Sequence, residues 1–332
     1  MRPAIAQPCN AAPASAAASL RPPAAGSPTN SACSRSTRRR WPARISTPSF
    51  HTLTGLEANV SGSLADVCIL TFAVDRPDEL ARCIASVAAQ RGSPRLRHRV
   101  LSERVDALRD APALARWRTA VEWHSLDGEP FQGASSPRIA RLRQAALLDV
   151  QEPFVCFLDD DNAIDPDHIR SLLDLIERDG LDAAHSWRFV RFPDGSPFPF
   201  DFFPWQGDPA VAAQLYRECV ELGAIVPGSP VMRDGAPRNA PADADAGSLT
   251  VDMNEWLFKT ETLRRIGFDT EFSETDLRMR TGEDDKLYRR FLRHAVRFAC
   301  TEQPTVQYYL GGVSNLRLTS GPTVETLDGG AA

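Results

Sequence analysis

Continuous apolar runs alternate along the chain with segments whose apolar residues recur at about a 3.6-residue period. The continuous runs predict buried strands, and VCILTF (67–72) is the clearest example. The periodic segments predict amphipathic helices, as in the stretch that follows Pro77. The expected strands are 67–72, 96–101, 119–124, 154–158, 183–189 and 305–309. The expected helices are 78–90, 137–148, 167–178, 261–266 and 283–294.

Apolar strands that alternate with helices are typical of an α/β fold, because a parallel sheet is covered by helices on both faces. We therefore expect one α/β domain over residues 61–318, with a mostly parallel central sheet. The regular pattern stops between residues 192 and 248, where aromatic residues and proline mix and a Pro/Gly/Ala/Asp-rich stretch follows. Long segments without a pattern commonly serve as binding loops or lids, and we expect such a role here.

The two ends of the chain have a different composition. Residues 1–60 are rich in Ala, Pro and Ser, and they hold seven arginines against one acid, Glu57. Such a segment buries too little apolar surface to offset chain entropy, which predicts a disordered tail. A targeting peptide, a tether to an anionic surface and an incorrectly chosen start codon stay open as interpretations. Residues 319–332 are expected to form a flexible tail.

Composition excludes some classes of function. The chain has 332 residues and a formal net charge of −5, which argues against nucleic acid as the main partner. No run approaches the roughly 20 apolar residues that a transmembrane helix needs. The seven cysteines include no CxxC pair, so neither a disulfide framework nor a zinc site is expected. We predict a cytoplasmic location, with peripheral membrane association left open.

The first candidate for chemistry is a run of three aspartates, Asp159, Asp160 and Asp161, directly after the apolar strand at 154–158. In open α/β sheets, ligands bind at the carboxyl ends of the strands. Three adjacent carboxylates ionise together only at a cost unless a cation is near. Carboxylate oxygens suit Mg²⁺ or Mn²⁺, which also bridge to diphosphates. The alternative is that these acids only cap the next helix or face water.

The second candidate is Gly282-Glu283-Asp284-Asp285, which opens the expected helix at 283–294. Acids at a helix N-terminus complement the helix dipole, and this role alone could explain them. A carboxylate in this position could also act as a general base for an incoming hydroxyl group.

Five segments in order resemble family 2 glycosyltransferases with the GT-A fold. The first, 67–90, is similar to the opening strand and helix of that family, and FLDDDNAIDPDHI (157–169) to its metal-binding DxD stretch. GEDDKLYRRF (282–291) resembles its Glu-Asp motif, and 257–272 resembles the segment that precedes that motif. LRQAAL (142–147) resembles its Ala-Arg-Asn-x-Gly-Leu. Together the resemblance covers roughly residues 64–316.

The resemblance implies a metal-dependent, inverting glycosyltransferase that moves a sugar from a nucleotide-sugar donor to an acceptor hydroxyl. The acceptor could be a glycan, a lipid-linked sugar or a natural product. Carried over by position, Asp161 and Asp159 would bind Mg²⁺ or Mn²⁺, and Asp284 would be the catalytic base assisted by Glu283. The remaining residues that the resemblance assigns to the donor are Arg143, Asp75, Arg76, Asp159 and Asp160, the last in the variable DxD position.

The chain departs from the family pattern in places. The paired aspartates that usually end the second strand are missing, so Glu103 or Asp106 would have to substitute for them. Gln144 and Ala146 stand where asparagine and glycine are common. These changes leave the identity of the nucleotide open.

Aromatic residues suggest where an acceptor could bind. Either they stack on a sugar or a hydrophobic acceptor, or they fill the core beneath the loop. Those in the irregular segment are Phe198, Phe200, Phe202, Phe203 and Trp205. Trp256 has the same two interpretations.

Three other functions remain possible from the sequence. A haloacid-dehalogenase-type, Mg²⁺-dependent phosphatase would use Asp159 as a nucleophile, but Ala163 stands where such enzymes have threonine or valine. A nucleotidyltransferase would need a Gly-rich loop at 72–77, which is absent. A catalytically inactive, glycosyltransferase-like binding protein would not need the acids at 159, 161 and 284.

Overall fold

The computed structural model describes residues 50–52, 66–92, 95–126, 135–234, 251–279 and 281–312. The chain divides into two units, Met1–Ile45 and Ser46–Ala332, and every element described below belongs to the second. Most of the expected N-terminal tail and all of the expected C-terminal tail lie outside the described residues. Phe50–Thr52 are an exception, because they form a strand, β1, that pairs with β4. These three residues lie within the segment 1–60 that the sequence predicts to be a tail.

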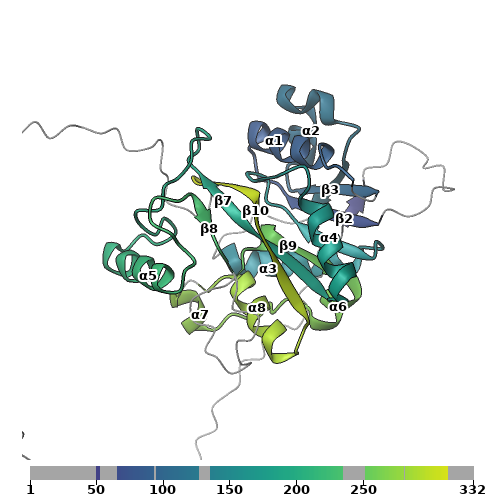
Figure 1. Ribbon diagram of the computed structural model, residues 1–332. Helices are drawn as coiled ribbons and strands as arrows, with labels where there is room; N and C mark the ends of the chain where they lie inside the picture. The colour runs from purple at the N-terminus through teal and green to yellow at the C-terminus, as the bar shows by residue number, and fades with distance from the viewer. Residues whose placement is uncertain are drawn as a thin grey trace, which may run out of the picture. The chain divides into compact units, whose positions relative to one another are not determined.

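A single ten-stranded sheet organises the domain (Figure 1). Its strands follow the order β1-β4-β3-β2-β5-β9-β7-β10-β6, and β8 pairs with β7. Their bounds are β1 Phe50–Thr52, β2 Val67–Phe72, β3 Leu96–Ser102, β4 Glu122–Leu126, β5 Phe154–Phe157, β6 Ala163–Ile164, β7 Ala183–Arg191, β8 Val231–Met232, β9 Trp256–Lys259 and β10 Phe298–Tyr309. Strands β4, β3, β2 and β5 are parallel, and β7 and β10 are parallel. Strand β9 is antiparallel to both β5 and β7, so these six strands share one direction. This confirms the expected mostly parallel sheet.

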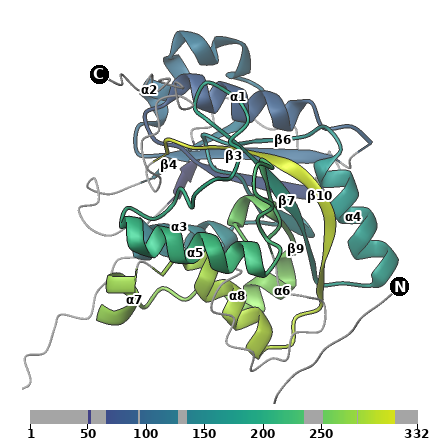
Figure 2. The ribbon, with the colours of Figure 1, turned by 60° about the vertical axis from the view of Figure 1, so that its left-hand side comes forward.

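Helices cover both faces of the sheet (Figure 2). The α-helices are α1 Pro77–Ala88, α2 Val105–Asp110, α3 Ser135–Leu148, α4 His168–Asp179, α5 Pro209–Glu221, α6 Thr260–Ile266, α7 Glu274–Met279 and α8 Glu283–Arg293. Alternate residues of β2 point to opposite faces, as the two-residue period of a strand requires. Val67 and Ile69 pack with the buried side chains of α1 and α4. Cys68 and Leu70 pack with those of α3, α6 and α8.

The irregular segment between residues 192 and 248 contains a helix that the hydrophobic pattern did not reveal, α5. The Asp208 side chain caps it by accepting hydrogen bonds from the Ala210 and Val211 N–H groups at 2.9 and 3.1 Å. Pro209 then occupies the first helical turn, where a missing N–H costs nothing. Most of the helix is exposed, so it lacks a strong apolar stripe. Residues 235–250 lie outside the described residues.

The aromatic residues of this segment divide between core and surface. Phe198 and Phe200 are fully buried, whereas Phe202 is 36% exposed. Phe203 and Trp205 are partly buried against the same core. Trp256 is buried beside Phe258 and Phe291, so it is a core residue. Core packing therefore explains Phe198, Phe200 and Trp256, and contact with an acceptor is left to the others.

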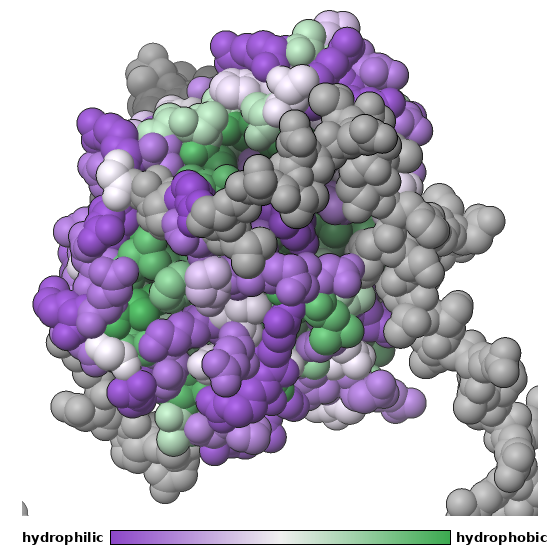
Figure 3. Space-filling model, turned by 90° about the vertical axis from the view of Figure 1, so that its right-hand side faces the viewer, coloured by the Kyte–Doolittle hydropathy of each residue, from purple (hydrophilic) through white to green (hydrophobic). Residues whose placement is uncertain are grey.

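The surface hydropathy shows no large apolar area on the face in Figure 3. On the face shown in Figure 3, apolar residues form separate small areas among hydrophilic ones. In the described part of the chain, no helix is both long and apolar enough to cross a bilayer. Among the described cysteines, Cys68, Cys83, Cys156 and Cys219 are buried free thiols.

Candidate active site

Asp159 follows the carboxyl end of β5, and its carboxylate is held on both sides. Its Oδ1 accepts a hydrogen bond from Arg143 Nη2 at 3.0 Å, and its Oδ2 accepts one from Asn254 Nδ2 at 2.9 Å. The Asp159 N–H group donates to Asn254 Oδ1 at 2.6 Å. The side chain is still 42% exposed. Asp159 therefore presents a carboxylate of fixed orientation to solvent.

Asp160 and Asp161 face the turn that follows β2. Asp160 is 2% exposed, accepts the Val74 N–H group at 2.8 Å and pairs with Arg76. Burial raises its pKa to about 7, against the opposing effect of Arg76. Asp161 accepts Arg76 Nη1 at 2.6 Å, and its pKa is raised by burial and by the charge of Asp159. Arg76 therefore joins the turn after β2, which is called the first turn below, to Asp160 and Asp161.

The loop that follows β5, which carries Asp159–Asp161, also contacts α1 and β10. Arg82 Nη2 donates to the Asp161 main-chain oxygen at 2.8 Å, and its guanidinium lies 3.7 Å from the centre of the Tyr309 ring. The Asn162 Oδ1 atom accepts the Tyr309 N–H group at 2.9 Å. These contacts give the loop little freedom to move relative to the sheet.

The acids at the start of α8 have three different environments. Glu283 pairs with Arg143, and Asp285 Oδ2 accepts the Gly282 N–H group at 2.7 Å, which caps the helix. Asp284 Oδ1 accepts only a local hydrogen bond, from the Asp285 N–H group at 2.9 Å. Burial raises the pKa of Asp284 well above its ordinary value, and the charges of Asp285, Glu283 and Asp252 add to this effect. A raised pKa of this kind is what a carboxylate needs to act as a general base near neutral pH.

Arg143 connects the two acidic motifs. Its side chain is 3% exposed and lies between Asp159 of the DxD stretch and Glu283 of α8. Burial of a guanidinium is tolerated where carboxylates compensate its charge. The structure thus brings Asp159, Arg143 and Glu283 into contact, and Asp284 follows Glu283 in α8.

Some predicted donor residues lie further out on the surface. Asp75 is 53% exposed and pairs with Arg104, not with the aspartates at 159–161. Glu103, which follows β3, pairs with Arg138 of α3, whereas Asp106 pairs with Arg109 within α2. Of the two residues considered as substitutes for the missing aspartate pair, Glu103 therefore joins the end of β3 to α3, whereas Asp106 pairs within its own helix.

The sequence analysis did not predict a second set of charged residues, which is centred on Arg188. Arg188 of β7 pairs with Asp234, lies 3.2 Å from Glu255 Oε1 and lies 3.4 Å from Asp252 Oδ2. Asp234 and Glu255 are almost completely buried, and burial raises the pKa of both carboxyls. Asp252 also accepts hydrogen bonds from Asn254. Only the spacing Asp252-x-Asn254-Glu255 could have signalled this set in the sequence.

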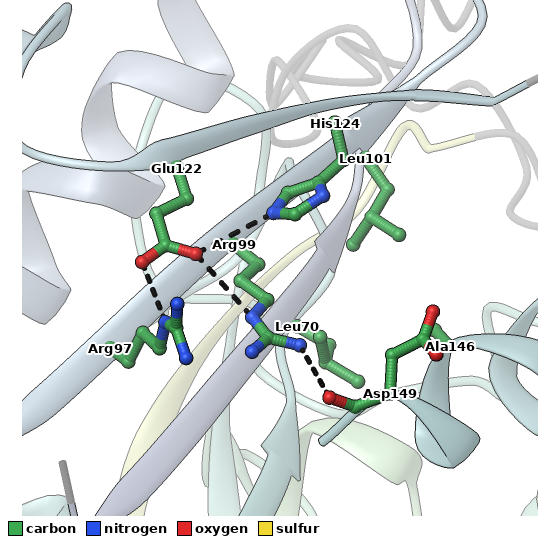
Figure 4. Close-up of a pocket in the computed structure, with 8 residues that line it drawn as sticks. All are labelled: Leu70, Arg97, Arg99, Leu101, Glu122, His124, Ala146 and Asp149. Atoms are coloured by element: carbon green, nitrogen blue, oxygen red, sulfur yellow. Dashed lines mark hydrogen bonds and ion pairs between the residues drawn. The ribbon is translucent and has the colours of Figure 1, made fainter. Parts of the chain in front are cut away.

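A cavity of about 200 Å³ lies elsewhere, against β3, β4 and α3 (Figure 4). Glu122 contacts Arg97, Arg99 and His124, and Arg99 Nη1 donates to the Asp149 main-chain oxygen at 3.2 Å. Arg97 also pairs with Glu152, which is buried. Opposite charges in this cavity are already paired with one another. The candidate active site is therefore the one at the carboxyl ends of the strands, not this cavity.

The carboxylates at 159–161 suit a cation that takes its remaining ligands from a substrate and from water. Within the described ranges, no group of three or more His, Cys, Asp and Glu side chains could hold a metal ion. Mg²⁺ is commonly bound through one or two carboxylates, with substrate phosphates and water completing the octahedron. The mutual repulsion of Asp159 and Asp161, which helps to raise the pKa of Asp161, is what a divalent cation would relieve.

A comparison with family sequence models agrees with these motifs. Residues 135–233, which run from α3 to β8 and include Asp159–Asp161, match the family described as Glycosyl transferase family 2. No curated protein matches the chain. Together with the fold, the family match confirms the resemblance that the motifs indicated: the chain carries a glycosyltransferase domain of the GT-A class. The matched segment is less than half of the chain.

Solved structures with a similar fold include one bacterial and one archaeal protein. S. aureus TarS 1-349 is 13% identical, with a TM-score of 0.45 over 74% of this chain and 60% of that one. The mannosyltransferase PcManGT from Pyrobaculum calidifontis, in complex with GDP-Man and Mn²⁺, is 12% identical, with a TM-score of 0.45 over 73% of this chain and 56% of that one. The chain thus covers less than two thirds of either protein's length.

Proposed function

We propose that the protein transfers a sugar from a nucleotide-sugar donor to an acceptor hydroxyl, with the help of Mg²⁺ or Mn²⁺ and with inversion at the anomeric carbon. The single observation that supports this most is the position of Arg143 between Asp159 and Glu283. It joins the carboxylates that suit a metal–diphosphate complex to the helix start that carries the candidate base.

On the donor side, Asp159 and Asp161 would hold the cation. When bound, the cation supplies positive charge that stabilises the leaving diphosphate. Arg143 and Arg76 pair with these carboxylates, and both guanidiniums would add to the positive potential around a diphosphate. Asp160 would contribute through the first turn, because it holds the Val74 N–H group and Arg76. Asp75, in the same turn, would lie beside the nucleotide.

On the acceptor side, Asp284 would accept the proton of the acceptor hydroxyl. The resulting oxygen nucleophile forms a bond to the anomeric carbon while the bond from that carbon to the diphosphate oxygen breaks. The raised pKa of Asp284 favours this role, since a base is most effective when its pKa lies near the working pH. Glu283 would keep α8 in register with the donor site through Arg143.

The acceptor would approach between the start of α8 and the segment around Trp205. Phe202 is exposed, and the Trp205 Nε1–H group donates to the Tyr308 hydroxyl at 3.3 Å, which keeps that indole oriented. Aromatic faces of this kind suit a glycan, a lipid-linked sugar or a natural product. We propose a cytoplasmic location for the reaction, and no nucleic acid as a partner.

The test of this proposal uses the full chain and four nucleotides, UDP, dTDP, GDP and CDP, each with and without Mn²⁺. A nucleotide at a hundred times its dissociation constant stabilises the folded state by roughly 2.7 kcal/mol, which a thermal unfolding measurement resolves. We expect one nucleotide to stabilise the protein only with Mn²⁺. We also expect the matching nucleotide sugars to be hydrolysed slowly by the wild type.

The variant Asp284→Asn isolates the base. It should retain the metal-dependent stabilisation and lose donor hydrolysis, whereas Glu177→Gln, an exposed acid on α4, should behave as the wild type. The proposal is wrong if no nucleotide stabilises the folded protein. It is also wrong if Asp284→Asn turns over as fast as the wild type.

A further inference from the structure

We infer that Asn254 is a positioning residue for the Asp159 carboxylate and that Asp252 and Arg188 keep Asn254 in place. The inference rests on the proposed function, because Asp159 matters here as one of the two carboxylates that would hold the cation. Asn254 itself would touch neither metal nor donor. Its role is to fix the direction in which Asp159 presents its oxygens.

The contacts of Asn254 determine the orientation of its amide group. Its Oδ1 accepts the Asp159 N–H group at 2.6 Å, and its Nδ2 donates to Asp159 Oδ2 at 2.9 Å and to Asp252 Oδ1 at 2.7 Å. The reverse orientation would bring the amide oxygen against two carboxylates and the amino group against an N–H donor. Asn254 is 2% exposed, so water does not readily replace these partners.

The pairing of β5 with β9 explains why these two residues meet. The strands are antiparallel, and Val155 lies opposite Phe258. Four residues further along β5 is Asp159, and four residues back from Phe258 is Asn254. The same register, continued past the ends of both strands, therefore brings Asn254 opposite Asp159. The sheet itself sets the relation between the two side chains.

Asp252, two residues before Asn254, holds the Asn254 side chain in place. Asp252 Oδ1 accepts both the Asn254 N–H group, at 3.0 Å, and the Asn254 side-chain amide. Asp252 Oδ2 lies 3.4 Å from Arg188 Nη1. Arg188 is buried beside the rings of Trp205 and Tyr308, with its guanidinium carbon 4.9 and 5.2 Å from the ring centres. The chain of contacts from Arg188 to Asp159 is continuous.

The physical effect of this chain is preorganisation. An aspartate that is 42% exposed at the end of a strand would otherwise sample several rotamers, and binding a cation would have to select one of them. Arg143 holds one oxygen of Asp159 and Asn254 holds the other. Groups that hydrogen-bond a metal ligand without touching the metal change metal affinity by about 10- to 100-fold when they are removed.

The experiment measures Mn²⁺ binding to the full chain, from the loss of the electron paramagnetic resonance signal of free Mn²⁺. We expect Asn254→Ala to raise the Mn²⁺ dissociation constant by about tenfold. The matched control is Thr260→Val, which removes another buried hydrogen bond, from Thr260 Oγ1 to the Glu152 main-chain oxygen at 2.7 Å. Thr260→Val should lose thermal stability to a similar degree and bind Mn²⁺ as the wild type does.

A second variant covers the case in which Asn254→Ala does not fold. Asp252→Ala leaves Asn254 in place but removes the oxygen that accepts its two hydrogen bonds, and it should weaken Mn²⁺ binding by a smaller factor. Wild-type Mn²⁺ affinity in every folded variant would overturn the inference while leaving the proposed function intact. A wild-type protein that binds no Mn²⁺ would overturn both the proposed metal dependence and the inference.

Discussion

Arg143 of α3 pairs with Glu283 at the first residue of α8, and the same guanidinium donates to Asp159 at 3.0 Å. The Arg143 side chain is 3% exposed and that of Glu283 is 13% exposed. Removing one partner of a buried ion pair leaves the other charge uncompensated, which destabilises a protein by about 3–5 kcal/mol. The relation therefore matters both for stability and for the alignment of the two acidic motifs.

The variant Arg143→Gln should accordingly lower the free energy of unfolding by about 3 kcal/mol, measured in urea. The double variant Arg143→Gln, Glu283→Gln should recover part of this loss, because the buried Glu283 carboxylate is no longer left without its partner. Arg91→Gln provides the contrast. Its pair with Asp167 is about two thirds exposed on both sides, and we expect a loss below about 1 kcal/mol. Equal losses in the two single variants would contradict the argument.

Gly282 controls the position of Asp284. A Cβ atom at residue 282 would collide with the Asp284 Oδ1 atom, whereas the backbone there is extended and suits any residue. Gly282→Ala should therefore displace the Asp284 carboxylate without straining the main chain. We expect turnover to fall by about 100-fold, as for other misplaced catalytic groups, with the nucleotide-induced thermal shift retained.

Gly207→Ala is the matched control for that variant, because a Cβ atom at residue 207 meets nothing within 4 Å. It should leave turnover unchanged. If Gly282→Ala is also fully active, then Asp284 in its present position is not the group that accepts the proton.

The strongest elements of the fold and site could be predicted from the sequence for physical reasons. β2 and β5 are buried on both faces, so their sequences are apolar except for Thr71, and the aspartates mark where β5 ends. The helix α8 begins at Gly282 with its acids, which is a local signal. In contrast, α5 is mostly exposed and lacks a clear stripe, and β1 is only three residues long.

Long-range pairing was the part that the sequence could not supply. The contact of Arg143 with Glu283 joins positions 140 residues apart, and nothing in either segment specifies the other. Asn254 meets Asp159 only because β9 pairs with β5 in one register. The family resemblance predicted that Asp159 and Arg143 lie near the donor, whereas only the spacing Asp252-x-Asn254-Glu255 pointed to the buried set around Arg188.

The pH dependence of turnover should report on the acids of α8. Asp284 must be ionised to accept a proton, so kcat should rise with pH through its pKa, which burial and the charges of Asp285 and Glu283 hold well above the ordinary aspartate value. Asp285→Asn removes one of these charges, yet its amide oxygen can still accept the Gly282 N–H group. The rising limb should therefore move to lower pH in this variant. A limb that stays in place would separate Asp284 from the observed titration.

Stability at low pH should depend on the buried histidine His168. Its Nδ1 lies 2.7 Å from Thr305 Oγ1, and burial lowers its pKa from 6.5 to about 3. Below pH 6.5 the unfolded chain takes up a proton that the folded protein does not, so folding stability is lost as the pH falls toward 3. The loss from this one group is about 1.4 kcal/mol per pH unit within that window.

Compared at each pH, His168→Gln should therefore be less stable than the wild type at pH 7, and the gap should narrow by about 1.4 kcal/mol for each unit below 6.5. Other titrating groups, including Asp160, are common to both proteins and cancel in the difference. Thr305→Val removes the hydroxyl that His168 contacts but keeps the imidazole buried, so its stability should run parallel to that of the wild type. Urea unfolding at pH 7, 6, 5 and 4 measures both differences. A constant gap between His168→Gln and the wild type would mean that His168 is protonated in the folded protein, and its burial would then need a partner charge.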